Sequence, residues 1–540
     1  MKKPIAIEIH AAVLAGLTVL ASTTTARPAD AAPYFEEVAA PYGVQGCSGS
    51  KVGCWTNYMR MTDIDGDGDL DILLPNADGF FKKGEAQPFL VYLNDGSGVF
   101  TSGAEQIVHG YTGYVRQIAT GDVDGDGDLY LDLYIPSAWG DADVLLFNDG
   151  GVFVDHAATS LPGLHSHAGA TRFADVDNDG DLDLFVGAGW AQSAAAPAHL
   201  YLNDGTGKFT EAPVGQLPSG KGAHPIDFNV FDADGDHDLD LLLDLHATKS
   251  RLWINDGAGH FTDASASIPP QPGLKSGPVA CDVDGDGDLD AVIASLSGNE
   301  RVLLNDGTGH FKAVEGAFPT VSDSTLWFDF GDVNGDGRLD CATAQGESSF
   351  LDRLYLGTPN APVDVRAPTF RSVEDVKGPV PASATPIVRF GVVDSATTDE
   401  GPRLRKAWIR VTVGKTTTDV AARFSGGDLY RASLPAWPTG DVTVSYAACA
   451  KDWQGNEGCS AAKTYAVQGA EGTTTGSGGA GGGGRGGSNG AGGQGASSNG
   501  ASGNAGGCTC AVAGEAPSSA LGGLIGLGFA ALTAARRRRS

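Results

Sequence analysis

A short ladder of aspartates recurs six times between Asp63 and Asp340, and no other feature constrains the fold as strongly. In the first copy, carboxylates occupy every second position from Asp63 to Asp71, and Gly68 stands at the sixth position. Like charges at this density repel one another unless a cation lies among them. The copies are 59, 53, 57, 50 and 50 residues apart and begin at Asp63, Asp122, Asp175, Asp232, Asp282 and Asp332. This near-constant period predicts a repeat array assembled around divalent cations.

The segments between the ladders follow one plan that predicts four short strands in each repeat. Each ladder runs into an apolar segment, such as Ile72–Leu74 after the first copy. In five repeats a second apolar segment ends in Asn-Asp-Gly, which favours the tight turn of a β-hairpin, and a Phe soon follows. These turns begin at Asn94, Asn148, Asn203, Asn255 and Asn305. Four strands in roughly fifty residues are typical of one blade of a β-propeller.

The sixth repeat ends early, and this predicts how the array closes. Its second turn is reduced to Leu356-Gly357-Thr358, and no Phe-initiated segment follows. Residues 34–38, near the other end of the chain, have the pattern of the missing strand. We therefore expect the N-terminal strand to complete the last blade and to leave no free sheet edge. This arrangement gives six blades, and a divergent seventh blade within residues 39–61 is the alternative.

The ladders stop before residue 366, and a second domain is expected to follow. Residues 387–393 and 407–413 alternate between apolar and polar side chains as β-strands do. With frequent turns and no helical periodicity, residues 366–468 predict a small β-sandwich of immunoglobulin or fibronectin type. The expected fold class is therefore all-β. It comprises a six-bladed (alternatively seven-bladed) β-propeller over residues 32–360, followed by an immunoglobulin-like β-sandwich over residues 366–468.

Both ends of the chain have the composition of targeting or linking segments. Residues 1–31 combine Lys2 and Lys3 with a short apolar run and an Ala-Asp-Ala site, which together indicate a secretory signal peptide. Residues 469–507 consist almost entirely of small and polar residues and predict a disordered linker. Residues 508–540 hold two cysteines, a small-residue apolar segment and four consecutive arginines.

The cysteine pattern fits an exported protein. Disulfides persist in oxidising compartments, and two pairs are close enough in sequence to bridge locally. The expected pairs are Cys47 with Cys54 and Cys449 with Cys459. Spacing leaves open whether Cys281 and Cys341 are free thiols.

Each ladder supplies the oxygen ligands that Ca²⁺ prefers, which are six to eight oxygens at about 2.3–2.6 Å. A short acidic loop offers the side chains at positions 1, 3, 5 and 9 and the backbone carbonyl at position 7, while Gly at position 6 permits a sharp turn. An EF-hand is excluded because Leu74 stands where its Glu at position 12 would be. Strands rather than helices are also expected on both sides of the loop.

The ladders, the Asn-Asp-Gly turns and the fifty-residue period together resemble the FG-GAP/VCBS repeats of integrin α-subunit-type β-propellers, over residues 34–358. The resemblance implies that Ca²⁺ is the cofactor, in up to six structural sites, with position 7 acting through its carbonyl. The implied ligand residues are Asp63, Asp65, Asp67, Asp69 and Asp71; Asp122, Asp124, Asp126, Asp128 and Asp132; Asp175, Asp177, Asp179, Asp181 and Asp183; Asp232, Asp234, Asp236, Asp238 and Asp240; Asp282, Asp284, Asp286, Asp288 and Asp290; and Asp332, Asn334, Asp336, Arg338 and Asp340.

Three repeats depart from this pattern. In the second, Tyr130 stands at position 9, so that either the loop bulges by two residues or its site is weak. A register shifted to begin at Asp124 restores four carboxylates but loses the Gly at position 6. In the fourth, His237 replaces that Gly, and His tolerates positive φ better than most residues. In the sixth, Asn334 and Arg338 lower the negative charge, and we expect the lowest calcium affinity there.

The C-terminal segment resembles the myxobacterial C-terminal sorting signal, MYXO-CTERM. This resemblance implies processing at Cys508 or Cys510 and membrane association through the C-terminal segment only, with the arginine cluster cytoplasmic. A permanent single-pass anchor is the alternative. Both interpretations place the propeller outside the inner membrane, at the envelope or outer surface of a Gram-negative, myxobacterial cell.

Composition and motifs narrow the function. The formal net charge is −30, but the ladders hold 28 of the 66 acidic residues, so bound cations would cancel most of it. No basic motif offsets the acidic surface, which excludes nucleic acid as a partner. No nucleophile elbow, phosphate loop or dinucleotide motif occurs in a fitting context, so we assign no catalytic residue. We expect a calcium-stabilised adhesion or ligand-binding module for an extracellular glycan or protein. The alternative is a surface polysaccharide lyase or hydrolase with its active site in the propeller channel.

Overall fold

The computed structural model describes residues 35–468, apart from gaps at 44–45, 49–52, 80–81, 127–129, 165, 189–197, 219–224, 226, 245–249, 271–274, 282–285, 287, 296–300, 315–326, 345–350, 362, 395–403 and 438–441. The predicted signal peptide, linker and C-terminal sorting segment lie outside these residues. Within the described part of the chain, no helix has the length and apolar character needed to cross a membrane.

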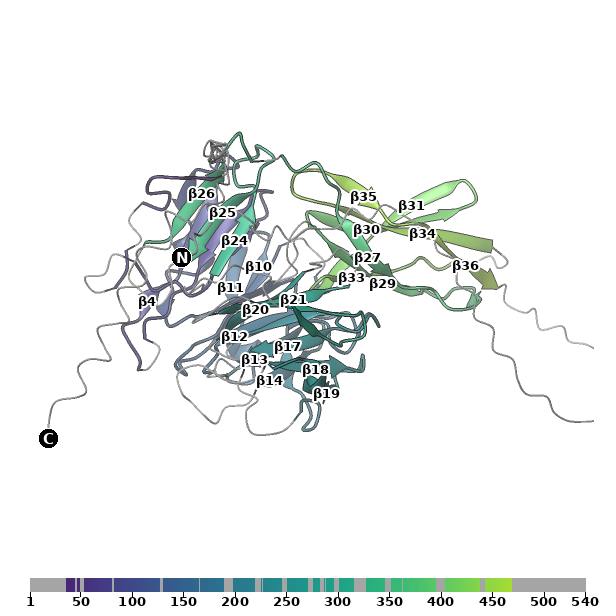
Figure 1. Cartoon of the computed structure of the whole chain (residues 1–540), viewed down its shortest axis with the longest axis horizontal. Coiled ribbons are helices and arrows are strands. Elements are labelled where there is room, and N and C mark those ends of the chain that lie inside the picture. The colour runs from purple at the N-terminus through teal and green to yellow at the C-terminus, as the bar shows by residue number, and fades with distance from the viewer. Residues whose placement is uncertain are drawn as a thin grey trace, which may run out of the picture.

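Six four-stranded antiparallel sheets follow one another from residue 35 to residue 357 (Figure 1). The first three are β2 (Arg60–Thr62), β3 (Asp71–Leu74), β5 (Leu90–Asn94) and β6 (Phe100–Ser102); β8 (Ala119–Gly121), β9 (Asp132–Ile135), β10 (Val144–Asp149) and β11 (Val152–Asp155); and β12 (Ala170–Ala174), β13 (Asp183–Gly187), β14 (His199–Asn203) and β15 (Phe209–Glu211). The next two are β16 (Asp227–Phe231), β17 (Asp240–Asp244), β18 (Arg251–Asn255) and β19 (Phe261–Asp263); and β20 (Lys275–Cys281), β21 (Asp290–Ser295), β22 (Arg301–Leu304) and β23 (Lys312–Val314). In each sheet a ladder loop joins the first strand to the second.

The sixth sheet is completed by the N-terminal strand. It consists of β24 (Trp327–Gly331), β25 (Asp340–Ala344), β26 (Arg353–Gly357) and β1 (Phe35–Glu37). Phe35 of β1 pairs with Gly357 of β26, which is the closure that the sequence predicts. The first strands contact one another from β8 through β12 and β16 to β20, and β24 contacts β2. The described sheets are therefore arranged side by side in a propeller-like manner, with the sixth beside the first.

The apolar runs that follow the first four ladders form the second strands β3, β9, β13 and β17, and each of these is buried on both faces. Ile72 and Leu74 pack with Ala342 of the sixth sheet, whereas Leu73 packs with Leu133 of the second sheet. The first sheet is thus covered by a neighbour on either side. This double burial explains why these strands read as continuous apolar runs instead of alternating ones.

Short elements occupy connections between successive sheets and, for β4, the connection between β3 and β5 within the first sheet. They are α1 (Ala104–Ile107), α2 (Ala157–Ser160), the 3₁₀ turn η2 (Ser265–Ser267), and a small pair of strands, β4 (Gln87–Pro88) and β7 (Thr112–Gly113). The disulfide Cys47–Cys54 lies in the segment between β1 and β2. Cys341 on β25 is a free thiol, and burial raises its pKa to about 12, so that it stays protonated and unreactive.

Residues 369–468 form two sheets that pack on one hydrophobic core. The first sheet has the order β27 (Thr369–Val373), β29 (Ile387–Val393), β33 (Leu429–Ser433) and β32 (Arg423–Gly426). The second has the order β28 (Val380–Pro381), β36 (Lys463–Gln468), β34 (Val442–Lys451), β30 (Lys406–Val413) and β31 (Thr416–Ala421), with β35 (Glu457–Cys459) paired to β34. Phe390 and Tyr430 of the first sheet share the core with Ile409 and Tyr446 of the second. This packing makes the domain a β-sandwich.

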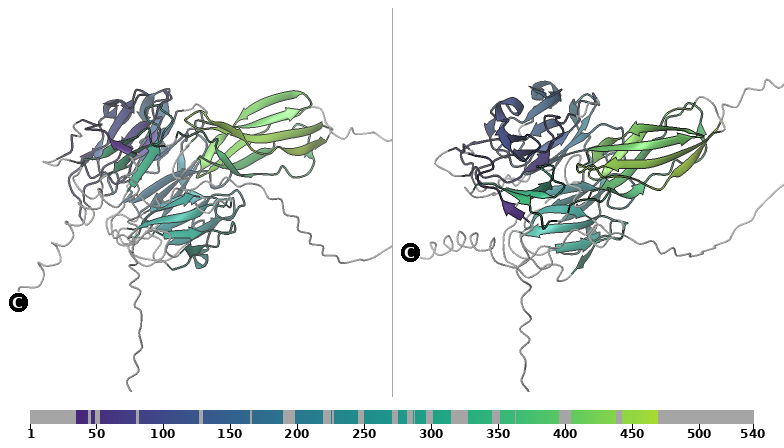
Figure 2. Two further views of the ribbon diagram at one scale, coloured as in Figure 1. Left: turned by 45° about the horizontal axis from the view of Figure 1, so that its top comes forward. Right: turned by 90° about the horizontal axis from the view of Figure 1, so that it is seen from above.

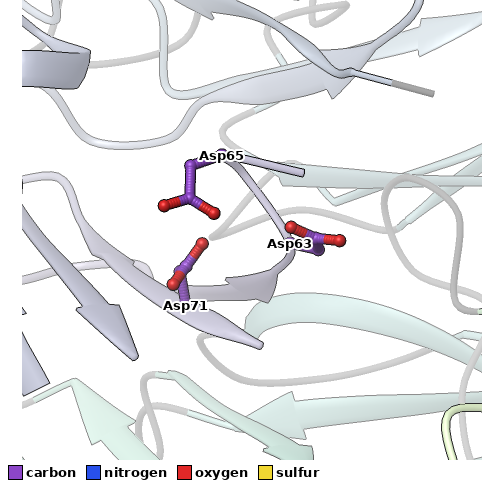
Figure 3. A group of neighbouring side chains, drawn as sticks. All are labelled: Asp63, Asp65 and Asp71. Carbon is purple, nitrogen blue, oxygen red and sulfur yellow. The ribbon is translucent and has the colours of Figure 1, made fainter. Parts of the chain in front are cut away.

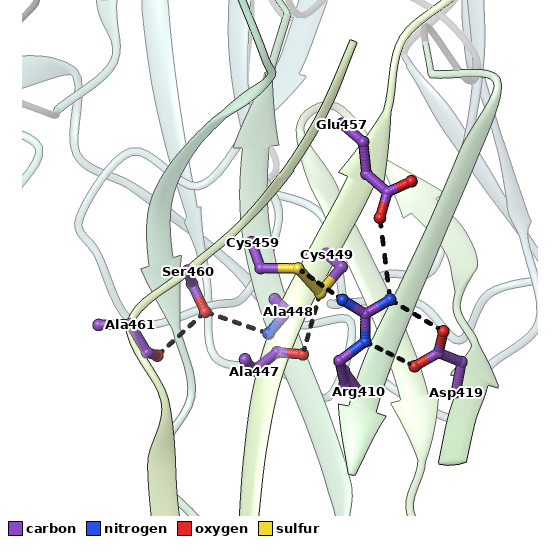
Figure 4. Close-up of a disulfide and its surroundings, with 9 residues drawn as sticks. All are labelled: Arg410, Asp419, Ala447, Ala448, Cys449, Glu457, Cys459, Ser460 and Ala461. Atoms are coloured by element: carbon purple, nitrogen blue, oxygen red, sulfur yellow. Dashed lines mark hydrogen bonds and ion pairs between the residues drawn. A yellow bond between two sulfur atoms is a disulfide. The ribbon is translucent and has the colours of Figure 1, made fainter. Parts of the chain in front are cut away.

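The second expected disulfide, Cys449–Cys459, joins β34 to β35 at the edge of the sandwich (Figure 4). Arg410 on β30 lies beside it and pairs with both Asp419 and Glu457. These three charged side chains are well exposed, so the pairs contribute little to stability.

The sandwich docks on the sheets through the turn between β32 and β33; in Figures 1 and 2 it lies to one side of them, in green and yellow. The N–H of Asp175 in the third ladder donates to the carbonyl oxygen of Ser425 at 2.7 Å. At Gly426, whose φ is 115°, an added Cβ would lie 2.8 Å from Cδ1 of Leu239. Leu429 is buried within a core cluster made by the third and fourth sheets. Only glycine at position 426 therefore lets the backbone of this turn lie so close to the ladder sheets.

Candidate metal centres

The first ladder shows how each loop is shaped by its own carboxylates. The two oxygens of Asp63 accept the N–H groups of Gly66 at 2.7 Å and Gly68 at 3.0 Å. These bonds curl the backbone around the carboxylate, as Asx turns do. Position 6 adopts the positive φ that the sequence predicts, 98° at Gly68 and 69° at His237 of the fourth ladder. The loop is therefore folded by local bonds into a concave arrangement of oxygens.

The aspartate at position 9 ties the loop to the rest of its sheet. Oδ2 of Asp71 accepts the N–H of Ile64, and Oδ1 accepts the N–H of Asn94 from the Asn-Asp-Gly turn. Asp71 is fully buried. The same pair of backbone bonds holds Asp132, Asp183, Asp240 and Asp340. Each oxygen keeps a lone pair that a cation can use.

Four of the described ladders bring three carboxylate oxygens within 4.8 Å of one another. In the first ladder these belong to Asp63, Asp65 and Asp71, whose side chains converge in Figure 3. Oxygens on opposite sides of a Ca²⁺ ion lie about 4.6–5.2 Å apart, so this spacing fits one such ion. The other groups are Asp122, Asp124 and Asp126; Asp175, Asp177 and Asp179; and Asp232, Asp234 and Asp240.

Burial makes these carboxylates resist ionisation. It raises the pKa of Asp71 to about 8, that of Asp132 to about 7, and those of Asp63 and Asp232 to about 6. Neighbouring aspartates raise the pKa of Asp71 further, while the backbone N–H donors oppose the shift. Because a cation offsets this cost of burying negative charge, each loop gains stability when one binds.

The second ladder keeps its start at Asp122 and accommodates extra length before its last aspartate. Asp132 accepts the backbone bonds from Val123 and Asn148 that Asp71 accepts in the first loop. Asp132 follows Asp122 by two residues more than Asp71 follows Asp63. Asp132 therefore takes position 9 of a register that begins at Asp122, with two additional residues before it. Asp128 lies outside the described residues.

The fourth and fifth ladders are described to different extents. In the fourth, Oδ1 of Asp234 is buried and has no hydrogen-bond partner among the described residues, so it is an acceptor that a cation would satisfy. In the fifth, Asp282 and Asp284 lie outside the described residues. Asp290 is buried, and its Oδ1 accepts the N–H of Asn305 at 2.8 Å.

The sixth ladder differs from the first four in the grouping of its carboxylates. Its carboxylates at positions 1, 5 and 9 are not grouped within the 4.8 Å that the first four ladders reach. Nη1 of Arg338 lies 3.3 Å from Oδ2 of Asp336 and so neutralises one of them. Nε of Arg338 also donates to the carbonyl oxygen of Ala361 in the linker to the sandwich.

The Asn-Asp-Gly turns bond successive sheets together, a role that turn propensity did not reveal. Nδ2 of Asn203 donates to the carbonyl oxygen of Leu182 in its own ladder and, at 2.7 Å, to that of Val123 in the preceding one. Asn94, Asn148, Asn255 and Asn305 bond to the preceding ladder in the same way. The turn glycine is also constrained, because a Cβ at Gly96 would lie 2.5 Å from the Asp69 carboxylate. Five such bonds thus join the six sheets in one series at the end where the ladder loops and turns lie, and the sixth turn has Gly357 where the others have Asn.

The family model for the FG-GAP-like repeat matches three stretches, residues 63–131, 245–293 and 282–343. Each stretch contains at least one ladder and the strand that follows it. The chain contains FG-GAP-like repeats.

No curated protein sequence matches this chain. Among solved structures, fructofuranosidase from Schwanniomyces occidentalis complexed with fructose is 8% identical, with 78% of this chain and 92% of that chain covered and a TM-score of 0.27. Fructan 1-exohydrolase IIa from Cichorium intybus is 7% identical, with 80% and 92% covered and a TM-score of 0.28. A tetra-tandem repeat from the extending region of a large adhesion protein is 12% identical, with 76% and 98% covered and a TM-score of 0.16. Likenesses this low carry no argument about activity.

The sandwich presents a row of arginines to the FG-GAP-like ladders. Arg389, Arg431 and Arg423 pair with one another in register across β29, β33 and β32, so they lie side by side on one face of the sheet. Nη1 of Arg431 lies 2.7 Å from Oδ2 of Asp175, and both side chains are almost completely buried. Like charges placed directly opposite one another destabilise a sheet, so this arginine row requires the acidic partner that the ladders supply.

The other arginines of the row reach the neighbouring ladders. Arg389 pairs with Asp238, and its Nη1 donates to Oδ1 of Asn178 and to the carbonyl oxygen of His237, both at 2.8 Å. Arg423 donates to the carbonyl oxygen of Gly125 at 3.4 Å. These contacts were not predicted from the sequence. The sequence feature that could have indicated them is an arginine within an otherwise apolar strand, as in Ile387–Val393.

The innermost strands hold a buried polar network where a channel active site would be expected. Nη1 of Arg172 donates to Oε1 of Gln117 at 2.8 Å, and Nε2 of Gln117 donates to Oδ1 of Asp227 at 3.0 Å. The three residues come from three successive repeats, and each is at most 4% exposed. This network therefore joins three repeats through buried side chains.

Proposed function

We propose that this protein is an exported, calcium-stabilised, six-bladed β-propeller that acts as an adhesion or ligand-binding module for an extracellular glycan or protein. In this proposal residues 1–31 direct export, the sandwich is of immunoglobulin type, and the segment 508–540 sorts the protein to the cell envelope. The two disulfides are of the kind that persists outside the cytoplasm.

The observation that carries the binding role is the difference between the two ends of the sheets. The ladder loops and Asn-Asp-Gly turns gather at one end, where they are nearly uniform and the sandwich covers part of them. The connections between second and third strands leave from the opposite end and vary from five to fifteen residues. They are 75–89, 136–143, 188–198, 245–250, 296–300 and 345–352. Loops that vary on a constant scaffold are where binding surfaces arise.

Equivalence of the ladders supports a structural role for calcium. The groups occupy the same place in successive sheets, and their position 9 aspartates make the same backbone bonds. A catalytic metal would set one loop apart by an open coordination position. The buried Arg172–Gln117–Asp227 network likewise favours binding over the polysaccharide lyase or hydrolase that was the alternative.

An array of extracellular glycans and matrix proteins, probed with the full chain in calcium and in EDTA, tests the proposal. We expect saturable binding to one ligand class in calcium and its loss in EDTA, because the scaffold loosens without the ion. Absence of any ligand in calcium, together with release of sugars from a polysaccharide panel, would favour the enzyme.

A further inference from the structure

Three aspartates outside the ladders converge where the sheets join the sandwich. Asp364 lies in the linker between β26 and β27, Asp394 directly follows β29, and Asp452 directly follows β34. One carboxylate oxygen of each lies within 4.8 Å of the other two. The three residues are 30 and 58 positions apart in sequence, and they come from the linker and from both sheets of the sandwich.

In this junction cluster Asn456 donates to both oxygens of Asp452 and the N–H of Arg366 donates to Oδ1 of Asp364, but Oδ2 of Asp364 is left unsatisfied by the described residues. The Asp364 side chain is 8% exposed, and its Oδ2 is buried without a hydrogen-bond partner in the described part of the chain. Asp452 is fully buried. The basic residue beside the cluster is Arg366, whose Nε lies 3.9 Å from Oδ1 of Asp364 and whose side chain is 61% exposed. A solvated guanidinium cannot offset three converging carboxylates, and a buried carboxylate oxygen without a partner is costly.

We propose that Asp364, Asp394 and Asp452 bind one Ca²⁺ ion at the junction between the propeller and the sandwich. The donor set is made of carboxylate oxygens, which hard divalent cations prefer, and its spacing suits Ca²⁺. Mg²⁺ demands near-ideal octahedral geometry at about 2.0–2.1 Å and keeps several waters, so it fits this converging protein cluster less well.

The position of the cluster indicates what the ion does. The N–H of Asp364 donates to the carbonyl oxygen of Gly337 in the sixth ladder at 2.8 Å. The carbonyl oxygen of Asp364 accepts a bond from Nδ2 of Asn456 in the sandwich at 3.2 Å. An ion held by Asp364, Asp394 and Asp452 therefore fixes the linker to both domains and holds the sandwich in place against the ladders.

Counting bound calcium tests the assignment separately from the ladders. The full chain is compared with the variants Asp394→Asn and Asp364→Asn by equilibrium dialysis against Ca²⁺. Asp452 is left intact because Asn456 donates to both of its oxygens. We expect each variant to bind one ion fewer than the parent, whatever the ladders contribute. Asp419→Asn, an exposed sandwich carboxylate paired with Arg410, is the matched control and should leave the count unchanged. A parental count in both variants overturns the proposal.

Thermal unfolding provides a second test, because the effect of Asp394→Asn on Tm should differ between EDTA and calcium. In EDTA, Asp394→Asn removes repulsion among three carboxylates, so its Tm should equal or exceed that of the parent. In calcium the variant loses the ion, and its Tm should fall below that of the parent. The same Tm difference in EDTA and in calcium would show that the cluster holds no ion. If the ladders fail to bind calcium, the parent binds one ion and Asp394→Asn none, which separates this site from the proposed function.

Discussion

Nη1 of Arg431 lies 2.7 Å from Oδ2 of Asp175, and this buried ion pair joins residues that are 256 positions apart in sequence. Asp175 is the first residue of the third ladder, and Arg431 is in the middle of β33. The sandwich therefore contributes a fixed positive charge to a candidate calcium loop. Docking of the two domains and the charge of the ladders are linked through this contact.

Replacing Arg431 should weaken the domain interface most when calcium is absent. Arg431→Ala leaves Asp175 buried without its partner, a change that costs about 3–5 kcal/mol. In calcium the cost should be smaller, because the ion compensates the same carboxylate. Chemical denaturation in EDTA and in calcium measures both values. Arg410→Ala is the matched control, since its pairs are exposed and worth less than about 1 kcal/mol. Equal costs for the two variants in EDTA would contradict this interpretation.

Asn94 bonds the first sheet to the sixth. Its Nδ2 donates to the carbonyl oxygen of Val333 in the sixth ladder at 2.7 Å, across 239 residues. Asn94→Ala leaves a buried carbonyl unpaired, so the free energy of unfolding should fall by about 1–3 kcal/mol. Ser97→Ala, in the same turn but exposed, should change it by no more than about 0.5 kcal/mol. Urea denaturation distinguishes the two, and a neutral Asn94→Ala would show that the bond does not stabilise this contact between sheets.

Local patterns predicted the features that local chemistry determines. A few consecutive residues determine each of three features: the Asp ladders, the Asn-Asp-Gly turns and the closing strand at Phe35–Glu37. The structure contains all three. The positive φ at His237 was also expected, because position 6 of the loop requires it.

Contacts between residues that are far apart in the chain could not be predicted from the sequence. No local pattern distinguishes Arg431 from a surface arginine, and only the folded structure shows that it pairs with Asp175. The junction cluster has no spacing signature, because its ligands come from a linker and two strand ends. The sequence left the register of the second ladder open, and the backbone bonds that Asp132 accepts from Val123 and Asn148 are those expected of a register that begins at Asp122.

Metal-free protein should lose stability as pH rises from 5 to 8. Burial raises the folded-state pKa of Asp71 to about 8 and that of Asp132 to about 7, far above the value of about 3.9 in the unfolded chain. The folded state thus binds protons more tightly, and this contribution is complete below about pH 4 and is lost as pH rises through the folded pKa. Denaturation in EDTA at both pH values checks the sign, and greater stability at pH 8 would refute it.

In calcium the dependence on pH should reverse. The ion requires deprotonated carboxylates, so protons compete with it, and apparent affinity should fall as the solution is acidified from pH 8 to 5. Calcium titrations of the full chain at the two pH values measure this competition. An affinity that does not change with pH would show that Asp71 and its equivalents are already ionised in the metal-free loops.

Restoring the missing carboxylate should strengthen the sixth ladder. Asn334 stands at position 3, where the five other ladders have Asp, and Arg338 already neutralises Asp336. Asn334→Asp adds a negative oxygen ligand, and calcium affinity rises with the number of charged ligands. We expect the weakest phase of a calorimetric calcium titration to tighten several-fold. Asn360→Asp adds the same charge to the exposed linker nearby and serves as the control. If both variants shift the titration equally, general electrostatic attraction rather than ligation by position 3 explains the gain.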